Sequence, residues 1–181
     1  MALIAIWFTQ NKNFNATKKI RAKMIKELRM LSTNVQASMI GHETKSKEIA
    51  QLLKTHRHIF FCGHGLANCI AAEGALKMKE LTYLHCQDIT LHDLSNNFYG
   101  YFKRNPGSPI IFIILDKQTD KAKMIEDIAM LKESVSIWPI IVTDIKNEEE
   151  RDKLSTLTDG RIFFVQRSGW AMSALLCNLP L

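Results

Sequence analysis

The sequence is poor in the residues that mark fibrous, disordered or export-directed chains. Its 181 residues include only 8 glycines and 4 prolines, and the 23% that are charged are of both signs. Mean hydropathy is −0.07. These values exclude a collagen and argue against long disorder or a coiled coil. Because 46% of the residues are hydrophobic, a chain of this length can bury one full core, so we expect one structural unit.

Long apolar runs and cysteine motifs are also missing. Residues 1–8 form the longest apolar stretch near the start, which is too short to span a bilayer and has no basic residue ahead of it to make a signal peptide. The four cysteines contain no CxxC pair and no spacing typical of a disulfide framework; they are Cys62, Cys69, Cys86 and Cys177. We therefore expect reduced core thiols in a soluble, cytoplasmic protein without a membrane partner.

The net charge of +6 is concentrated in residues 12–29. Apolar residues recur there at helical spacing, which predicts that the basic side chains occupy the opposite, solvated face of a helix; the apolar set is Ile20, Met24, Leu28, Leu31 and Val35. Nucleic-acid binding is the alternative. No aromatic residue alternates with the basic ones between residues 16 and 39 and no zinc-finger or RNA-recognition pattern occurs, so we expect no nucleic-acid partner.

The hydrophobic pattern changes near residue 56. Helical stretches are expected before it at 1–10, 16–39 and 46–54. After it, short runs rich in Ile, Val and Phe alternate with helical segments, as in a parallel sheet covered on both faces. The expected strands are 58–63, 86–90, 109–115, 137–143 and 161–166, and the expected helices are 67–85, 119–134 and 147–157. We predict an α/β fold, a three-layer αβα sandwich with a five-stranded parallel sheet, in which an N-terminal helical segment (1–55) packs alongside residues 56–181.

The first loop of this pattern is the most informative. Gly63-His64-Gly65 follows a strand and precedes a helix that carries Asn68 in its first turn. Backbone N–H groups at such a helix start can face an anion, which makes these residues candidate ligand-binding positions. A dinucleotide fingerprint would need a third glycine at position 68. A tight turn without a ligand is the alternative interpretation.

The next helix places three charged residues on one face. Glu73, Lys77 and Glu80 are spaced by four and three residues in a segment that is otherwise apolar or small. We expect tight packing on both flanks of this helix, which would let the lysine tune the pKa of a carboxyl group for proton transfer. A buried ion pair that only fixes packing is the alternative. The alternate spacing of His56 and His58 is a weak metal pattern without a third ligand, so we expect no metal and no cofactor.

These motifs together resemble a known family. Residues 72–85, AEGALKMKELTYLH, preceded by the GHG of 63–65, are similar to the pattern GRG followed by LEGALKLKEISYIHAE in the sugar isomerase (SIS) domain. More narrowly, they resemble the second SIS subdomain in the isomerase half of glucosamine-6-phosphate synthases. The likeness extends over nearly the whole chain, including 172–176 as the start of the family's last helix, and it implies a five-stranded parallel αβα sandwich.

The resemblance also implies roles for the three charged residues. The glutamate that matches Glu80 is the base that moves a proton between C2 and C1 of an open-chain sugar phosphate, the lysine that matches Lys77 assists, and the glutamate that matches Glu73 orders the site. Proton abstraction beside a carbonyl or imine needs such a carboxylate and a cation to steady the developing charge. The implied ligand is fructose 6-phosphate, glucosamine 6-phosphate or a relative of them.

Several family features differ or are missing. The family histidine that opens the sugar ring aligns with Asn96 or with Tyr99, and neither residue can replace an imidazole. The Ser-Gln-Ser-Gly-Glu-Thr-like phosphate loop of the first subdomain does not occur, and residues 116–119 follow the corresponding strand. Both ends look cut from a larger assembly. We therefore expect a homodimer or a partner chain that carries the missing subdomain, and a binding module without turnover stays an alternative.

Overall fold

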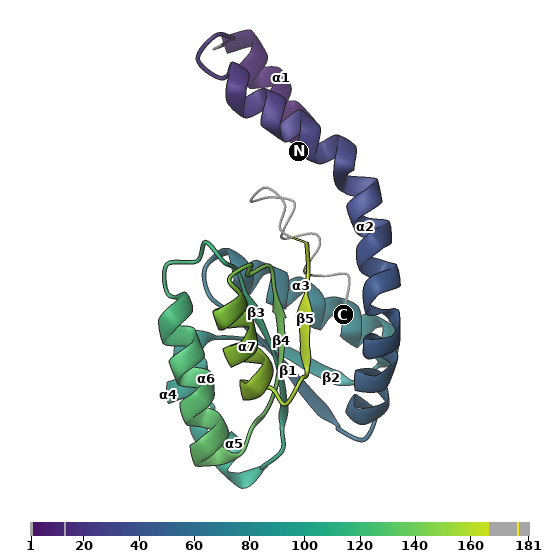
Figure 1. The fold of residues 1–181 in the computed structure, drawn as a ribbon. Coiled ribbons are helices and arrows are strands. Elements are labelled where there is room, and N and C mark those ends of the chain that lie inside the picture. Colours follow the sequence, from purple (N-terminus) through teal and green to yellow (C-terminus); the bar gives the residue numbers. More distant parts are fainter. Residues whose placement is uncertain (1, 13, 167–176, 178–181) are drawn as a thin grey trace.

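The fold is built around one parallel sheet. The computed structural model describes residues 2–12, 14–166 and 177. Its five strands are β1 (His58–Gly63), β2 (His85–Thr90), β3 (Pro109–Ile114), β4 (Trp138–Thr143) and β5 (Ile162–Phe164). All neighbouring strands are parallel and their spatial order is β2-β1-β3-β4-β5 (Figure 1). This confirms the predicted α/β class and the five-stranded parallel sheet.

The apolar strand runs are explained by two separate cores. Successive side chains of a strand point to opposite faces of the sheet, so Ile59 and Phe61 of β1 belong to one core while Phe60 and Cys62 belong to the other. The first core is covered by the end of α2 (Lys18–Leu53) and by α3 (Leu66–Thr82). Since both faces of the sheet are covered, the strands need no polar alternation.

The second core is covered by four helices from the later part of the chain. They are α4 (Leu91–Asn96), α5 (Tyr99–Arg104), α6 (Lys121–Val135) and α7 (Glu148–Leu157). Figure 1 shows them on the side of the sheet opposite to α2 and α3. The short helices α4 and α5 were not predicted, because each has only six residues, too few turns to show a helical period. They are the main difference from the expected order of elements.

The N-terminal helices differ from expectation in two ways. Two helices were predicted over 16–54, and this was wrong: α2 is one helix of 36 residues. Gly41 lies in its interior, but a glycine only weakens a helix, whereas a proline would interrupt its hydrogen bonds. Moreover, only the C-terminal half of α2 packs on the sheet. Its first half projects with α1 (Ala2–Lys12) away from the sandwich (Figure 1), and Ile20 of the expected core-facing stripe is exposed.

Further predictions concerned the basic face of α2, the cysteines and the last helix. The solvated basic face on α2 is present except at Arg21, which is buried, with its guanidinium over the Phe14 ring at 4.6 Å. Cys69 is exposed, whereas Cys62 and Cys86 are buried as expected. The helix expected to begin within 172–176 lies outside the described residues. None of the helices in the described part of the chain has the length and apolarity needed to cross a membrane.

Candidate functional site

The loop after β1 has a backbone that requires glycine. A Cβ atom placed on Gly63 would lie 2.4 Å from both the carbonyl carbon and the carbonyl oxygen of Ala67, which is far inside van der Waals contact. Gly65 has φ 57° in the residue that precedes α3, a conformation that L-residues with side chains seldom adopt. The two glycines therefore let β1 turn directly into α3 with the helix packed closely against the strand.

This loop lies at the topological switch point of the sheet. The chain leaves β1 toward β2 on one side, while β3 lies on the other side of β1. In an open parallel sheet the crevice for a ligand lies outside the carboxyl ends of the strands at such a point. His64 Nε2, in the loop after β1, lies 2.8 Å from Asp120 Oδ2 in the loop after β3. The two side chains thus join the two loops that flank the switch point.

The loop after β3 is anchored from the neighbouring strand. The backbone N–H of Asp116 donates to Oδ1 of Asp144, which is buried just beyond β4, at 2.8 Å. Lys121 Nζ lies 2.7 Å from a carboxylate oxygen of Glu150 and 3.4 Å from one of Asp116. These contacts hold the segment that carries Asp120, so the His64–Asp120 pair rests on a braced loop.

Asn68 lies in the first turn of α3. Its Oδ1 atom is buried and has no hydrogen-bond partner among the described residues. A buried acceptor without a donor costs free energy, so such an atom in a native structure calls for a partner beyond the described residues, a ligand or solvent among them. The four predicted binding residues lie close together where β1 turns into α3; they are Gly63, His64, Gly65 and Asn68.

The predicted charged triad lies on the second half of the same helix. Lys77 Nζ donates to Glu80 Oε2 at 3.0 Å and lies 3.8 Å from Glu73 Oε1. The hydrogen bond from Lys77 to Glu80, together with the charges of Glu80 and Glu73, raises the pKa of Lys77 above its usual range. The lysine is therefore a cation at neutral pH, held between two carboxylates.

The expected tight packing on both flanks of α3 was wrong. The side chains of Glu73, Lys77 and Glu80 are each about half exposed. Leu76 is 44% exposed and Leu81 is 79% exposed on the same half of the helix. Only one flank of the helix packs on the sheet, through Ile70 and the small side chains of Ala67, Ala71 and Ala75. The triad is an open surface feature in this chain.

The two groups of candidate residues are well separated. Asn68 and Glu80 are twelve residues apart on one helix, which corresponds to about 18 Å along its axis. Glu73, the first residue of the triad, is only five residues from Asn68, or about 8 Å along the axis, so Glu80 is the member of the triad that lies furthest from the first group. Among the described residues, contacts join the members of the triad to one another, and none of the described hydrogen bonds or ion pairs joins the triad to the residues at the start of α3.

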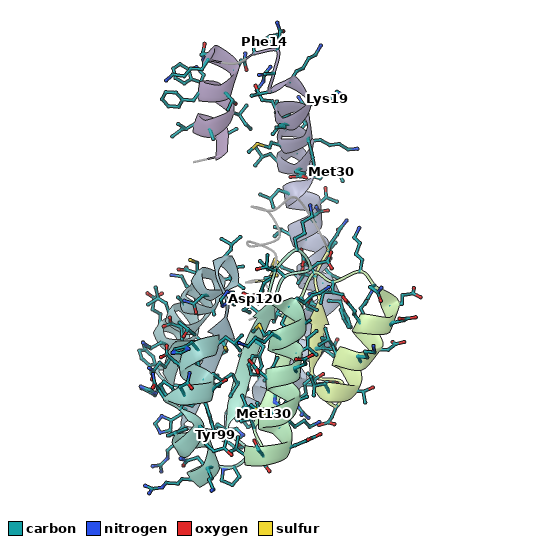
Figure 2. All side chains as sticks on the ribbon, turned by 90° about the vertical axis from the view of Figure 1, so that its left-hand side faces the viewer. Phe14, Lys19, Met30, Tyr99, Asp120 and Met130 are labelled. Atoms are coloured by element: carbon teal, nitrogen blue, oxygen red, sulfur yellow. The ribbon has the colours of Figure 1, made fainter. Side chains whose placement is uncertain are left out.

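A cleft extends from the His64–Asp120 pair along the face of the sheet that α4 and α6 cover, which is the face opposite to α3. It has a volume of about 490 Å³ and lies between α4 and α6. Two of its lining residues are labelled in Figure 2, Asp120 just before α6 and Met130 further along that helix. The polar residues that line it are His64, His92, Ser95, Asn96, Asp120, Lys123 and Asp127. Small-molecule sites commonly have volumes of about 300–1,000 Å³.

Sequence reasoning missed most of this cleft. The sequence gives Asn96 only as the residue aligned with the family's histidine, whereas in the structure its Nδ2 donates to the His92 backbone carbonyl at 2.9 Å. Asp120, Lys123 and Asp127 gave no local signal, because they meet the first loop only through the order of the strands. The one available clue was the rule that loops after neighbouring parallel strands share an edge of the sheet.

His56 and His58 contact different neighbours, although their alternate spacing in the sequence suggested that they lie on one side of a strand. His58 Nδ1 lies 3.2 Å from Nδ1 of His85, its partner on the neighbouring strand, while His56 stacks on Trp138. His56 and His58 therefore do not act as a pair. Within the described residues, no three side chains of His, Cys, Asp or Glu lie together as a group that could hold a metal ion.

Comparison with known proteins relates the chain to one group of enzymes. No family model matches. The chain is 25% identical over 182 residues, 99% of its length, to glutamine–fructose-6-phosphate aminotransferase [isomerizing] of Corynebacterium diphtheriae, of which it covers 28%. The relative from Streptococcus mutans is 27% identical over 129 residues, and the match covers 71% of this chain and 21% of that protein. The chain thus spans less than a third of these curated relatives.

Solved structures share the fold. The C-terminal domain of glucosamine-fructose-6-phosphate aminotransferase from Francisella tularensis superposes with a TM-score of 0.70 at 22% identity, over 90% of this chain and 44% of that one. These similarities confirm the fold class and the resemblance predicted from residues 63–85.

Proposed function

We propose that this chain, a SIS-type domain similar to that of the glutamine–fructose-6-phosphate aminotransferases, binds a sugar phosphate of the fructose 6-phosphate or glucosamine 6-phosphate class. The similarity over 99% of the chain and the shared fold support this assignment. The observation that carries it is the triad on α3, where Lys77 Nζ donates to Glu80 at 3.0 Å and lies 3.8 Å from Glu73.

The triad suits proton transfer next to a carbonyl or imine carbon. Glu80 would act as the base that moves a proton between C2 and C1 of the open-chain sugar. Lys77, charged at neutral pH, would stabilise the enolate-like oxygen or nitrogen, and Glu73 would hold Lys77 in position. A positioned carboxylate and a neighbouring cation supply this chemistry without a cofactor.

The open position of the triad calls for a second unit. Leu81 and Tyr83 are 79% and 92% exposed beside it, and a site that is to exclude water needs a cover over such side chains. A second copy of the chain, or a partner chain with a further SIS-type unit, would close this face and supply the grip on the phosphate. The triad would engage the sugar only in that assembly.

A binding module without turnover is the second candidate. Asn96 stands where a gapless alignment places the family's ring-opening histidine, and in the structure it is bonded to His92 on α4. An amide cannot shuttle a proton at neutral pH. In this alternative the chain keeps the ligand and the assembly and loses the reaction.

The proposal is tested in two steps. Binding of a sugar phosphate to the folded chain raises the thermal midpoint in a saturable way, and sorbitol at the same concentration serves as the control. Turnover is then measured as exchange of the sugar C1 or C2 proton with deuterium, followed by NMR.

Glu80→Gln should abolish this exchange, whereas Glu43→Gln, which changes a similarly exposed Glu–Lys pair on α2, should not affect it. Binding without exchange would support the module. The absence of any midpoint shift with all three of fructose 6-phosphate, glucose 6-phosphate and glucosamine 6-phosphate would contradict the proposed function.

A further inference from the structure

We infer that the cleft between α4 and α6 is a second sugar-phosphate site, separate from the triad, and that it is the site at which the chain by itself binds this class of ligand. The inference rests on the proposed function for the class of ligand. Its location rests on the position of the cleft at the switch point and on the chemistry of its lining.

The cleft is already formed within one chain. Its two walls come from α4, which follows β2, and from α6, which follows β3, and the His64–Asp120 contact of 2.8 Å joins the loops at its head. The strand order places these loops at the sheet edge where open α/β folds bind ligands. In contrast to the triad, this site needs no second unit to complete its walls.

The lining combines groups that suit a hydroxyl-rich molecule with one anionic end. The carboxylates of Asp120 and Asp127 accept hydrogen bonds from hydroxyl groups, and the Lys123 ammonium and the His92 ring can face a phosphate. A bare phosphate would be repelled by the two carboxylates without the compensation of hydroxyl contacts. The mixed lining therefore predicts that a sugar phosphate binds better than inorganic phosphate and better than the uncharged sugar.

Asp127 lies on α6, between the cleft and the second core of the sheet. Burial, followed by the negative charges of Asp127 and Asp93, raises the pKa of the Cys62 thiol, which lies in the core at the end of β1. Cys62 is consequently a neutral thiol. Asp127 itself is partly buried and lines the cleft.

The experiment is isothermal titration of the full chain with glucosamine 6-phosphate, fructose 6-phosphate, inorganic phosphate and glucose. Two variants change the cleft, Lys123→Ala and Asp127→Asn. Each has a matched control: Lys117→Ala removes an exposed lysine from the loop after β3, and Glu126→Gln neutralises the exposed neighbour of Asp127 on α6. Two further variants, Glu80→Gln and Lys77→Ala, change the triad.

We expect each cleft variant to weaken sugar-phosphate binding at least tenfold, while the two control variants and the two triad variants change it less than twofold. Binding that is lost in the triad variants and kept in the cleft variants would overturn this inference and leave the proposed function standing. A wild-type chain that binds neither sugar phosphate would overturn both. Inorganic phosphate that binds as tightly as the sugar phosphates would contradict the assigned ligand class.

Discussion

The two ends of α3 carry different kinds of site. At its start, the close approach of β1 to α3 and a contact with a second loop define the geometry: Gly63 has no room for a side chain, and His64 meets Asp120 in the loop after β3. Near its end, the triad consists only of side chains from one helix, each about half exposed. One chain therefore forms the first site by its own folding, whereas the proposed function of the triad requires a covering surface.

The largest expected effect is at the first end. Gly63→Ala would place a methyl group 2.4 Å from backbone atoms of Ala67, which cannot move without separating α3 from β1. We expect a loss of about 3 kcal/mol in the free energy of unfolding, measured by urea denaturation. Gly41→Ala is the control, since nothing lies within 4 Å of its added methyl, and it should gain about 0.7 kcal/mol as a better helix former. Equal effects of the two variants would disprove the close approach.

A smaller effect is expected at the wall of the cleft. Thr90 caps α4 by accepting from the Asp93 N–H at 3.1 Å, and its hydroxyl donates to Asp93 Oδ2 at 2.7 Å. Thr90→Ala should cost about 1 kcal/mol at pH 7, read from urea denaturation. Because α4 carries His92 and Asn96, sugar-phosphate affinity should fall with it.

The same cap gives a pH dependence. Hydrogen bonds from Thr90 and then from Asn97 lower the pKa of Asp93. A lowered folded-state pKa contributes stability that is present above the ordinary aspartate pKa and is lost as the pH falls through the folded value. The stability gap between wild type and Thr90→Ala should therefore shrink when urea denaturation is repeated at successively lower pH below 4. A gap that stays constant would show that Asp93 is not coupled to the cap.

The smallest effect is expected at the exposed end of α3. Leu81 is 79% exposed, so Leu81→Ala should change the free energy of unfolding of the single chain by less than about 0.5 kcal/mol. Leu94→Ala, at a fully buried position on α4, should cost about 3 kcal/mol. If the triad face is covered in an assembly, Leu81→Ala should weaken that assembly in analytical ultracentrifugation. A large loss of stability at low protein concentration would instead mean that the chain covers this face by itself.

The contrast between the two ends of α3 also explains which features could be predicted from the sequence. Strands such as 58–63 and 109–115 were predictable because a strand buried on both faces is apolar throughout, and the structure places them at His58–Gly63 and Pro109–Ile114. The triad was predictable because spacings of three and four place residues on one face of a helix. Both signals are local.

The remaining features depend on tertiary structure. Nothing near Asp120 or Lys123 indicates that they lie across a cleft from His92, since that proximity follows from the order of the strands. The exposure of the triad was also not predictable, because a small, apolar helix has the same local pattern whether one flank or both are covered. The helix α2 continues through Gly41 because the free-energy cost of one glycine is small compared with the stabilisation of a helix of 36 residues.

The most direct test of the account is an NMR titration of the ¹⁵N-labelled chain with glucosamine 6-phosphate. Binding in the cleft of the single chain should move the amide shifts of residues 63–66, 91–96 and 118–127, while residues 76–84 at the other end of α3 stay unchanged. Shift changes centred on residues 76–84, with the cleft amides unaffected, would contradict it.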